Sequence, residues 1–155
     1  DEPDTLGFLL VNDKVKTATV VLKDKKFGKV GIEVTNIRVK NTVYFDDGVK
    51  FHSRIKFDIN LNDLERGVAS KVTDDDIKRI EKLAKKKIQK IALSAIHSCF
   101  EKKSDPFFAG KLLSRYSFDY YKKHIKTWRD ELPEIDVSVT AYSKFSLING
   151  NYTRK

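Results

Sequence analysis

The sequence predicts an α+β fold in which three helices pack on one face of a mostly antiparallel β-sheet. In the first half of the chain, apolar residues recur at every second position, which is typical of strands with one covered and one solvated face. After Thr73 they recur at every third and fourth position, which indicates amphipathic helices. An alternating segment near the C-terminus adds one final strand, so the order is strands, three helices and one strand.

The expected strands are separated by recognisable turns. "GFLLVNDKVKTATVVL" contains two extended apolar runs with the turn dipeptide Asn12-Asp13 between them. "KKFGKVGIEVTNIRVK" changes its apolar parity near Thr35-Asn36, which predicts a bulge or break. "TVYFDDGVKF" places Asp46-Asp47-Gly48 at a hairpin turn. The clearest strand covers residues 49–61, and its apolar side carries Val49, Phe51, Ile55, Phe57, Ile59 and Leu61.

A long amphipathic helix of about 28 residues is expected after Thr73, which can serve as its N-cap. The run Asp74-Asp75-Asp76 lies in the first turn, where the helix dipole favours negative charge. The spacing predicts an apolar stripe that widens toward the C-terminal end, with Ile77, Ile80, Ala84, Ile88, Ile91, Ala95 and Cys99 at its centre.

Two shorter helices are expected next. Asp105 fits the N-cap and Pro106 the first position of a helix that runs to about Arg115. Ser117 can cap a third helix that ends before Pro133. Its apolar stripe is Phe118, Tyr121, Ile125, Trp128 and Leu132. The expected structural anchors of this region are Asp105, Pro106, Tyr121, Ile125 and Trp128, and the final strand carries Ile135, Val137, Val139, Ala141 and Phe145.

Length and charge limit the class of protein. The 155 residues fit a single domain, residues 1–155, and the composition is that of a globular protein. The net charge of +9 is uneven: residues 1–72 hold 13 basic and 11 acidic side chains, and residues 73–155 hold 18 and 11. Such an excess favours phosphate-rich or acidic partners. The candidate membrane-facing or partner-facing surface is Lys78, Lys82, Lys85 and Lys86, although a merely solvated helix face explains the same pattern.

No catalytic or cofactor-binding motif is present, so the sequence predicts a protein that is not an enzyme and has no cofactor. His52, His97 and His124 have no metal-ligand spacing, so no metal site is expected. Cys99 is expected to be a small buried apolar residue rather than a nucleophile. A free-standing basic nucleic-acid-binding domain remains the alternative function, but no recognition motif for nucleic acid or for a small molecule is found.

The segments "KKSDPFFAGKLLSRY" and "YYKKHIKTWRDELPEIDVSVTAY" resemble the C-terminal domain of the C-subunit lipoproteins of bacterial spore germinant receptors, the GerAC-like family. The resemblance extends over nearly the whole chain, and its specific motifs lie in residues 100–140. Two positions depart from the family pattern: Tyr116-Ser117 stands where Tyr-Pro is common, and "SKFSLI" at 143–148 stands where a pair of arginines and Thr-Gly-Leu are common.

The resemblance implies a non-catalytic receptor subunit that acts in nutrient-triggered germination of a Bacillus-type spore former. Family members are longer, so this chain resembles their last domain. They are tethered by lipid at the outer face of the spore inner membrane, a tether that this sequence does not show. Their partners are the A and B membrane subunits, and an anionic lipid surface is a further candidate partner. Assembly, scaffolding and signal relay are the candidate roles.

Overall fold

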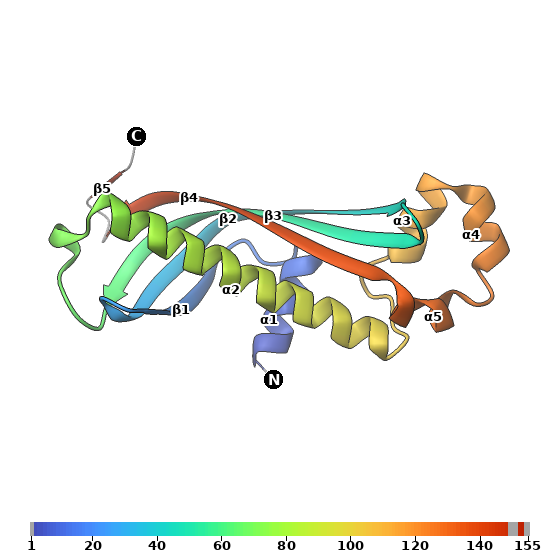
Figure 1. Ribbon diagram of the computed structural model, residues 1–155, viewed down its shortest axis with the longest axis horizontal. Helices are drawn as coiled ribbons and strands as arrows, with labels where there is room; N and C mark the ends of the chain where they lie inside the picture. The colour runs from blue at the N-terminus through green and yellow to red at the C-terminus, as the bar shows by residue number, and fades with distance from the viewer. Residues whose placement is uncertain (1, 149–151, 154–155) are drawn as a thin grey trace. The chain divides into compact units, whose positions relative to one another are not determined.

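The computed structural model describes residues 2–148 and 152–153 and contains an α+β fold, as the sequence predicts. The described strands form one sheet in the order β1-β2-β3-β4-β5 (Figure 1). The strands are β1 (Ala18–Asp24), β2 (Gly28–Phe45), β3 (Val49–Leu64), β4 (Asp136–Ile148) and β5 (Tyr152–Thr153). The helices are α1 (Glu2–Val11), α2 (Asp74–Glu101), α3 (Ala109–Tyr116), α4 (Phe118–His124) and α5 (Trp128–Glu131), with 3₁₀ turns at Ala69–Lys71 and Leu132–Glu134.

The chain divides into two compact units whose segments alternate along the sequence. Unit 1 consists of Asp1–Lys14, Val39–Arg54 and Ile91–Thr140, and unit 2 consists of Val15–Arg38, Ile55–Lys90 and Ala141–Lys155. One boundary, after Lys14, lies in the connection between α1 and β1, and the other four fall inside β2, β3, α2 and β4. Whether the whole chain acts as one domain therefore stays a prediction.

The sheet is mostly antiparallel. β1 pairs with β2 in a register that sets Ala18 opposite Val34 and Asp24 opposite Gly28. β2 and β3 form the predicted hairpin, in which Asp47 and Gly48 have positive φ angles. β3 and β4 are parallel neighbours, because Lys50 bonds Asp136 and His52 bonds Ser138, and both arrows point the same way in Figure 1. This pair needs the long connection through the helices.

The predicted parity change in β2 is confirmed. Val30, Ile32 and Val34 are buried, the next buried residue is Ile37, and Asn36 between them has a φ of 50°. Left-handed backbone of this kind is tolerated best by Asn and Gly, and it marks the irregular residue that shifts a strand's alternation. In β3 the predicted alternation is also confirmed, since Phe51, Ser53, Ile55, Phe57, Ile59 and Leu61 are buried.

α2 begins and ends where the sequence predicts. The Asp76 amide donates to the Thr73 hydroxyl at 3.2 Å, and Asp76 Oδ2 accepts from the Thr73 amide at 3.0 Å, which forms a reciprocal cap. In unit 2 the buried stripe Ile77, Ile80, Ala84 and Ile88 covers the sheet, and in unit 1 the stripe continues through Ala92, Ala95, Ile96 and Phe100. In unit 1, the Phe100 ring meets the ring of Phe51 of β3 edge to face at 5.5 Å.

The expectation of a strand in the first apolar run is wrong, because residues 2–11 form helix α1. A close contact at Gly7 accompanies this helix. A Cβ there would lie 2.7 Å from both the Ile91 carbonyl oxygen and the Ala95 Cβ, so the absent side chain lets α1 lie against α2 within unit 1. Asn12-Asp13 is a turn, as predicted, but it ends this helix: Asp13 has a φ of 55°, and the Lys14 amide donates to the Leu9 carbonyl.

The expected second helix starts later than predicted. Asp105 and Pro106 precede α3 instead of opening it, and the N-cap position is Phe108, with a φ of 59°. Asp105 nevertheless caps the helix, although it precedes the first helical residue by four positions. Its two carboxylate oxygens accept hydrogen bonds from the amides of Ala109 at 2.7 Å and Gly110 at 2.8 Å. The intervening turn buries Phe107, whose ring lies 5.9 Å from Phe8 and 6.2 Å from Phe100.

The expected third helix is broken into α4 and α5. Ser117 caps α4 as predicted, since its hydroxyl accepts from the Tyr120 amide at 3.4 Å. The break follows from Thr127, whose amide and hydroxyl both donate to the His124 carbonyl, so the helical ladder ends there. The described residues therefore hold five α-helices rather than three, and α4 buries none of its residues.

Candidate functional site

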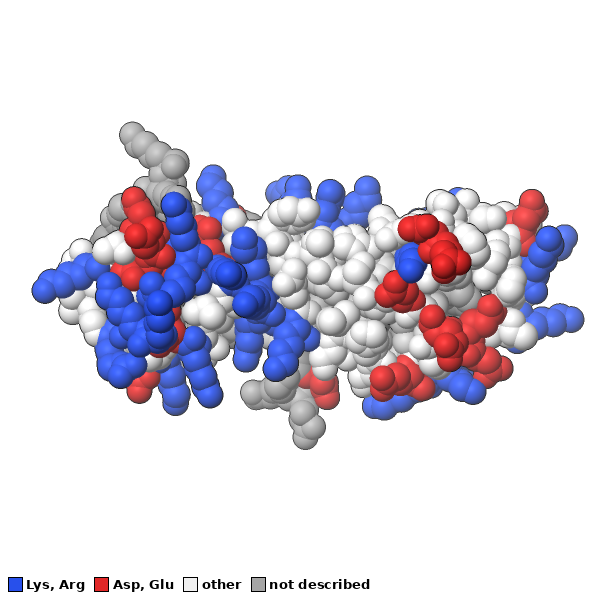
Figure 2. All heavy atoms as spheres, in the orientation of Figure 1, with Lys and Arg blue, Asp and Glu red and all other residues white. Residues whose placement is uncertain are grey.

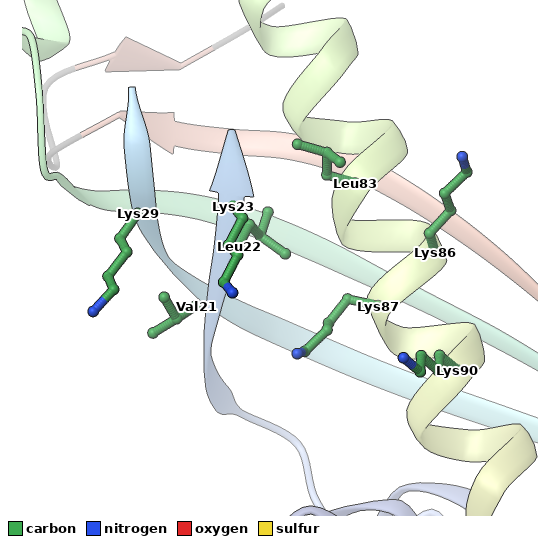
Figure 3. Close-up of a pocket in the computed structure, with 8 residues that line it drawn as sticks. All are labelled: Val21, Leu22, Lys23, Lys29, Leu83, Lys86, Lys87 and Lys90. Carbon is green, nitrogen blue, oxygen red and sulfur yellow. The ribbon is translucent and has the colours of Figure 1, made fainter. Parts of the chain in front are cut away.

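A basic groove lies beside the edge strand of unit 2, between β1 and the N-terminal half of α2 (Figure 3). It is open to solvent on one side and has a volume of about 540 Å³. Apolar side chains from both elements form part of its surface, and five lysines surround them. The lining residues are Val21, Leu22, Lys23, Lys29, Leu83, Lys86, Lys87 and Lys90. We call this set the basic groove.

The strand side of the groove follows from the alternation in β1. Leu22 is buried under α2, so its neighbours Val21 and Lys23 point to the opposite face of the edge strand, where Val21 is 52% exposed. Lys23 lies directly opposite Lys29 of β2 in the antiparallel register. Like charges in this arrangement repel each other. An anion placed between them would relieve that repulsion.

The helix side of the groove comes from one flank of α2. Leu83, Lys87 and Lys90 are spaced four and three residues apart and therefore share a flank, beside the buried stripe. Figure 3 shows the Lys87 side chain extending from α2 toward β1, whereas Lys86 extends away from it. Figure 2 shows many Lys and Arg side chains over this half of α2. None of the five groove lysines has a side-chain hydrogen bond or ion pair within the described part of the chain.

Asp24, Lys26, Asp76 and Arg79, which we call the Arg79 cluster, tie β1 to α2 in unit 2. Arg79 donates to both oxygens of Asp24, at 2.6 and 3.0 Å, and to Asp76 at 3.0 Å. Lys26 pairs with the other Asp76 oxygen at 2.8 Å. The two carboxylates are almost completely buried, while a quarter of the Arg79 side chain is exposed. These carboxylates are thus already paired and do not neutralise the groove lysines.

The hydrogen bonds in the Arg79 cluster keep both carboxylates ionised. The side-chain hydrogen bond from Arg79 outweighs burial and lowers the pKa of Asp24 from 3.8 to about 2. Burial alone would raise the pKa of Asp76, but hydrogen bonds from Lys26, Thr73 and Arg79 bring it well below its usual range. The hydrogen bond to Asp24 correspondingly raises the pKa of Arg79. Asp24, Asp76 and Arg79 are therefore charged at neutral pH.

The structure places the predicted lysines on α2 but brings just one of them to the groove. Lys78, Lys82 and Lys86 are exposed and Lys85 is half-buried, and of these Lys86 lines the groove. The prediction missed Lys87 and Lys90, although their spacing from Leu83 could have shown a basic flank. It also missed Lys23 and Lys29, because nothing local in the sequence says that β1 lies next to α2.

The predicted anchors of unit 1 differ in their surroundings. Asp105 accepts a third hydrogen bond, from the Trp128 indole Nε1 at 3.1 Å, and we call Asp105, Ala109, Gly110 and Trp128 the Asp105 cluster. Trp128 is 7% exposed, and a Cβ on Gly110 would lie 2.8 Å from its Nε1.

The remaining predicted anchors, Pro106, Tyr121 and Ile125, lie outside this cluster. Pro106 and Tyr121 are half-buried. The expectation that Ile125 packs in the core is wrong, because the helix break after His124 leaves it 51% exposed.

The surroundings of His52, His124 and Cys99 differ from those of a catalytic triad or a reactive thiolate. His52 Nδ1 lies 2.7 Å from Ser138 Oγ, but its Nε2 contacts the Thr140 hydroxyl at 3.0 Å instead of the carboxylate that orients the base in a catalytic triad. His124 Nδ1 pairs with Glu131 at 2.8 Å. Burial raises the pKa of the Cys99 thiol, which disfavours the reactive thiolate. Among the described residues, no group of three His, Cys, Asp or Glu side chains is placed to hold a metal ion.

Comparisons with known proteins agree with the resemblance seen in the sequence. The sequence model of the family described as "Spore germination B3/ GerAC like, C-terminal" matches residues 1–146. A solved structure titled "Crystal Structure of the GerBC protein" has the same fold, with a TM-score of 0.73 at 17% sequence identity. The match covers 92% of this chain and 44% of that one, so the chain spans less than half of its structural relative. No curated protein matches.

Proposed function

Because the chain belongs to the GerAC-like C-terminal family of spore germination proteins, we propose that it is the last domain of a germinant receptor C subunit. In this proposal it has no catalytic role and acts in nutrient-triggered germination through contacts with other receptor subunits. The family match over residues 1–146 is the observation that carries the proposal. The surroundings of His52, His124 and Cys99, which differ from those of known catalytic groups, support the non-catalytic part.

We place the subunit contact at the basic groove and the adjoining lysines of α2. Five groove lysines without carboxylate partners in the described chain form a surface that attracts acidic groups. Lys78, Lys82 and Lys85 extend that positive surface along α2. The proposed occupant is an acidic surface of the A or B membrane subunit. Some of its carboxylates would pair with Lys23 and Lys29 at the edge strand, and others with Lys87 and Lys90 on α2.

The proposed location is the outer face of the spore inner membrane, where the full-length protein would be held by a lipid anchor. Within the described residues, no helix has the length and apolar content that crossing a bilayer requires. A single lipid chain gives marginal attachment. Contacts between this domain and membrane-embedded subunits would therefore contribute to retention at the membrane.

Co-purification with the receptor tests the proposal. The full-length protein with Lys23→Glu, Lys87→Glu and Lys90→Glu should lose co-purification with the tagged A and B subunits, and spores carrying it should germinate more slowly in nutrient. The matched control is Lys40→Glu, Lys56→Glu and Lys144→Glu, which changes the net charge equally at exposed lysines outside the groove. Equal behaviour of the two triple variants would contradict a contact at the groove.

The same proteins separate this function from nucleic-acid binding. A domain that binds nucleic acid through the groove would associate with DNA or RNA with a steep salt dependence that the groove variant loses. If that binding were seen while the wild-type protein failed to co-purify with the receptor subunits, the alternative function would replace the proposed one.

A further inference from the structure

Helix α4 in unit 1 turns apolar side chains toward solvent. The helix, labelled α4 in Figure 1, buries none of its residues, and Phe118 at its start is 63% exposed. Ile125, directly after the helix, is 51% exposed, and Tyr116, just before it, is 54% exposed. A helix that contributes nothing to a core yet carries large apolar residues on its outer side is a candidate contact surface.

The contacts of α4 fix which side faces outward. The Tyr120 ring stacks on His124 at 4.1 Å and meets the Phe45 ring at 5.2 Å, so this side of the helix lies against the β2–β3 hairpin. Phe118 and Ile125 are seven residues apart, which is close to two helical turns, and therefore lie together on the opposite side. Lys122 lies between them on the same side.

Positive charge surrounds these apolar residues. Residues 109–127 carry five basic side chains and one acidic side chain, Asp119. None of the five basic groups forms a side-chain hydrogen bond or ion pair within the described residues. We call Tyr116, Phe118, Lys122, Lys123, Ile125 and Lys126 the α4 patch.

The combination of lysine with exposed aromatic and aliphatic residues identifies the chemistry of the occupant. Protein–protein interfaces are enriched in aromatic residues but depleted in lysine. Surfaces that lie in the headgroup region of a membrane use both, because the lysines meet lipid phosphates while the rings and aliphatic chains enter the boundary with the acyl chains. An uncharged or zwitterionic surface would leave three lysines of the patch without counter-charges.

We propose that the α4 patch docks on the surface of an anionic lipid bilayer. Phe118 and Ile125 enter the interface, and Lys122, Lys123 and Lys126 contact the phosphates of acidic lipids. This contact is separate from the proposed subunit contact at the basic groove and involves none of the groove residues. It requires a bilayer and no other subunit, so the two proposals can fail independently.

Binding to vesicles tests the lipid contact with the chain as it stands. The protein should sediment with vesicles of phosphatidylglycerol and phosphatidylcholine in equal parts and should bind pure phosphatidylcholine far less. Replacing Lys122 with Gln should lower the partition coefficient about fivefold, since each lysine near an anionic surface contributes about 1 kcal/mol. Phe118→Ser with Ile125→Ser should reduce binding further. The matched control is Val68→Ser with Tyr142→Ser, which removes comparably exposed apolar residues from unit 2.

A fluorescence measurement reports whether the patch itself enters the lipid. Phe118→Trp should show a blue shift with anionic vesicles and quenching by lipids brominated on the acyl chain, whereas wild-type Trp128, which is buried, provides the background signal. The proposal is overturned if the Phe118→Trp signal does not respond to vesicles that bind the protein. It is also overturned if Lys78→Gln with Lys82→Gln abolishes binding while the α4 variants do not.

Discussion

Each unit holds carboxylates that accept several hydrogen bonds, but from different partners: the carboxylate of unit 1, Asp105, is half-buried, and those of unit 2, Asp24 and Asp76, are buried. In the Asp105 cluster of unit 1, the carboxylate accepts from two backbone amides and the Trp128 indole, all of which are uncharged. In the Arg79 cluster of unit 2, Asp24 and Asp76 are held mainly by the charged groups of Arg79 and Lys26. The first arrangement positions a large aromatic ring, and the second joins a strand to a helix by charge.

This difference predicts different responses to mutation and to pH. Removing Trp128 should cost packing energy, because the ring fills the space that Gly110 leaves open. Removing Arg79 should cost electrostatic energy, because it leaves the buried Asp24 carboxylate without its cation and leaves Asp76 with Lys26 alone. Protonating Asp24 or Asp76 at low pH should also weaken the Arg79 cluster, but with a smaller loss of stability than removing Arg79.

The largest effect is expected from Trp128→Ala. It should lower the free energy of unfolding by about 4 kcal/mol, which is typical when a buried aromatic side chain is deleted. Trp128→Phe keeps most of the ring but removes the donor to Asp105, so it should cost about 1–2 kcal/mol. Denaturant unfolding followed by circular dichroism measures both. A Trp128→Ala protein as stable as wild type would show that the Asp105 cluster does not anchor unit 1.

A somewhat smaller loss is expected from Arg79→Met. The substitution keeps the apolar stem but removes the guanidinium, and breaking a buried pair in this way costs about 3 kcal/mol. Lys26 and the backbone amides of Lys26 and Phe27 still reach the two carboxylates, which limits the loss. Arg79→Lys should recover part of it, because it restores one charge without the two-oxygen contact to Asp24. An Arg79→Met protein of unchanged stability would mean that the ion pairs of Arg79 make no net contribution to the free energy of unfolding.

Acid should weaken the Arg79 cluster within a defined range of pH. The folded-state pKa of Asp24 is about 2, below its ordinary 3.8, so the ionised carboxylate stabilises the fold above about pH 4. That stabilisation, about 2 kcal/mol, should be lost as the pH falls from about 4 to 2. Thermal unfolding at several pH values measures it. Asp24→Asn should flatten the dependence in this range, and a variant with the slope of wild type would contradict the assignment to Asp24.

Much of the fold could be predicted from sequence periodicity, but neither the Arg79 cluster nor the Asp105 cluster could. The cap at Thr73, the length of α2 and the hairpin at Asp46-Asp47-Gly48 depend on neighbours within a few residues, so they could be predicted. Arg79 and Asp24 are 55 residues apart, and their contact depends on β1 lying beside α2. For the same reason, the basic surface of α2 could be predicted from the sequence, whereas the contribution of β1 and β2 to the basic groove could not.

The errors in the helices have local causes that compete with periodicity. α1 was expected as a strand because its short apolar run has no clear helical stripe, and the close packing of Gly7 against α2 depends on residues far away in the sequence. The single third helix was expected because Phe118, Ile125 and Trp128 have helical spacing. Hydrogen bonds from Thr127 to His124 end α4, and the chain then turns Trp128 inward while leaving Ile125 outside.

Ile125 gives the smallest and most selective prediction, because the sequence pattern and the structure disagree about it. If Ile125 belonged to the core with Trp128, truncating its side chain would cost about 2–5 kcal/mol. Since half of its surface is exposed, Ile125→Ser should change the free energy of unfolding by less than about 0.5 kcal/mol. The measurement is denaturant unfolding beside Trp128→Ala in the same buffer. A decrease of more than about 2 kcal/mol in the free energy of unfolding would indicate that Ile125 packs in the core, as a continuous helix predicts, and that it is not part of the α4 patch. An unchanged free energy of unfolding would agree with a side chain that is available to contact a surface outside the domain.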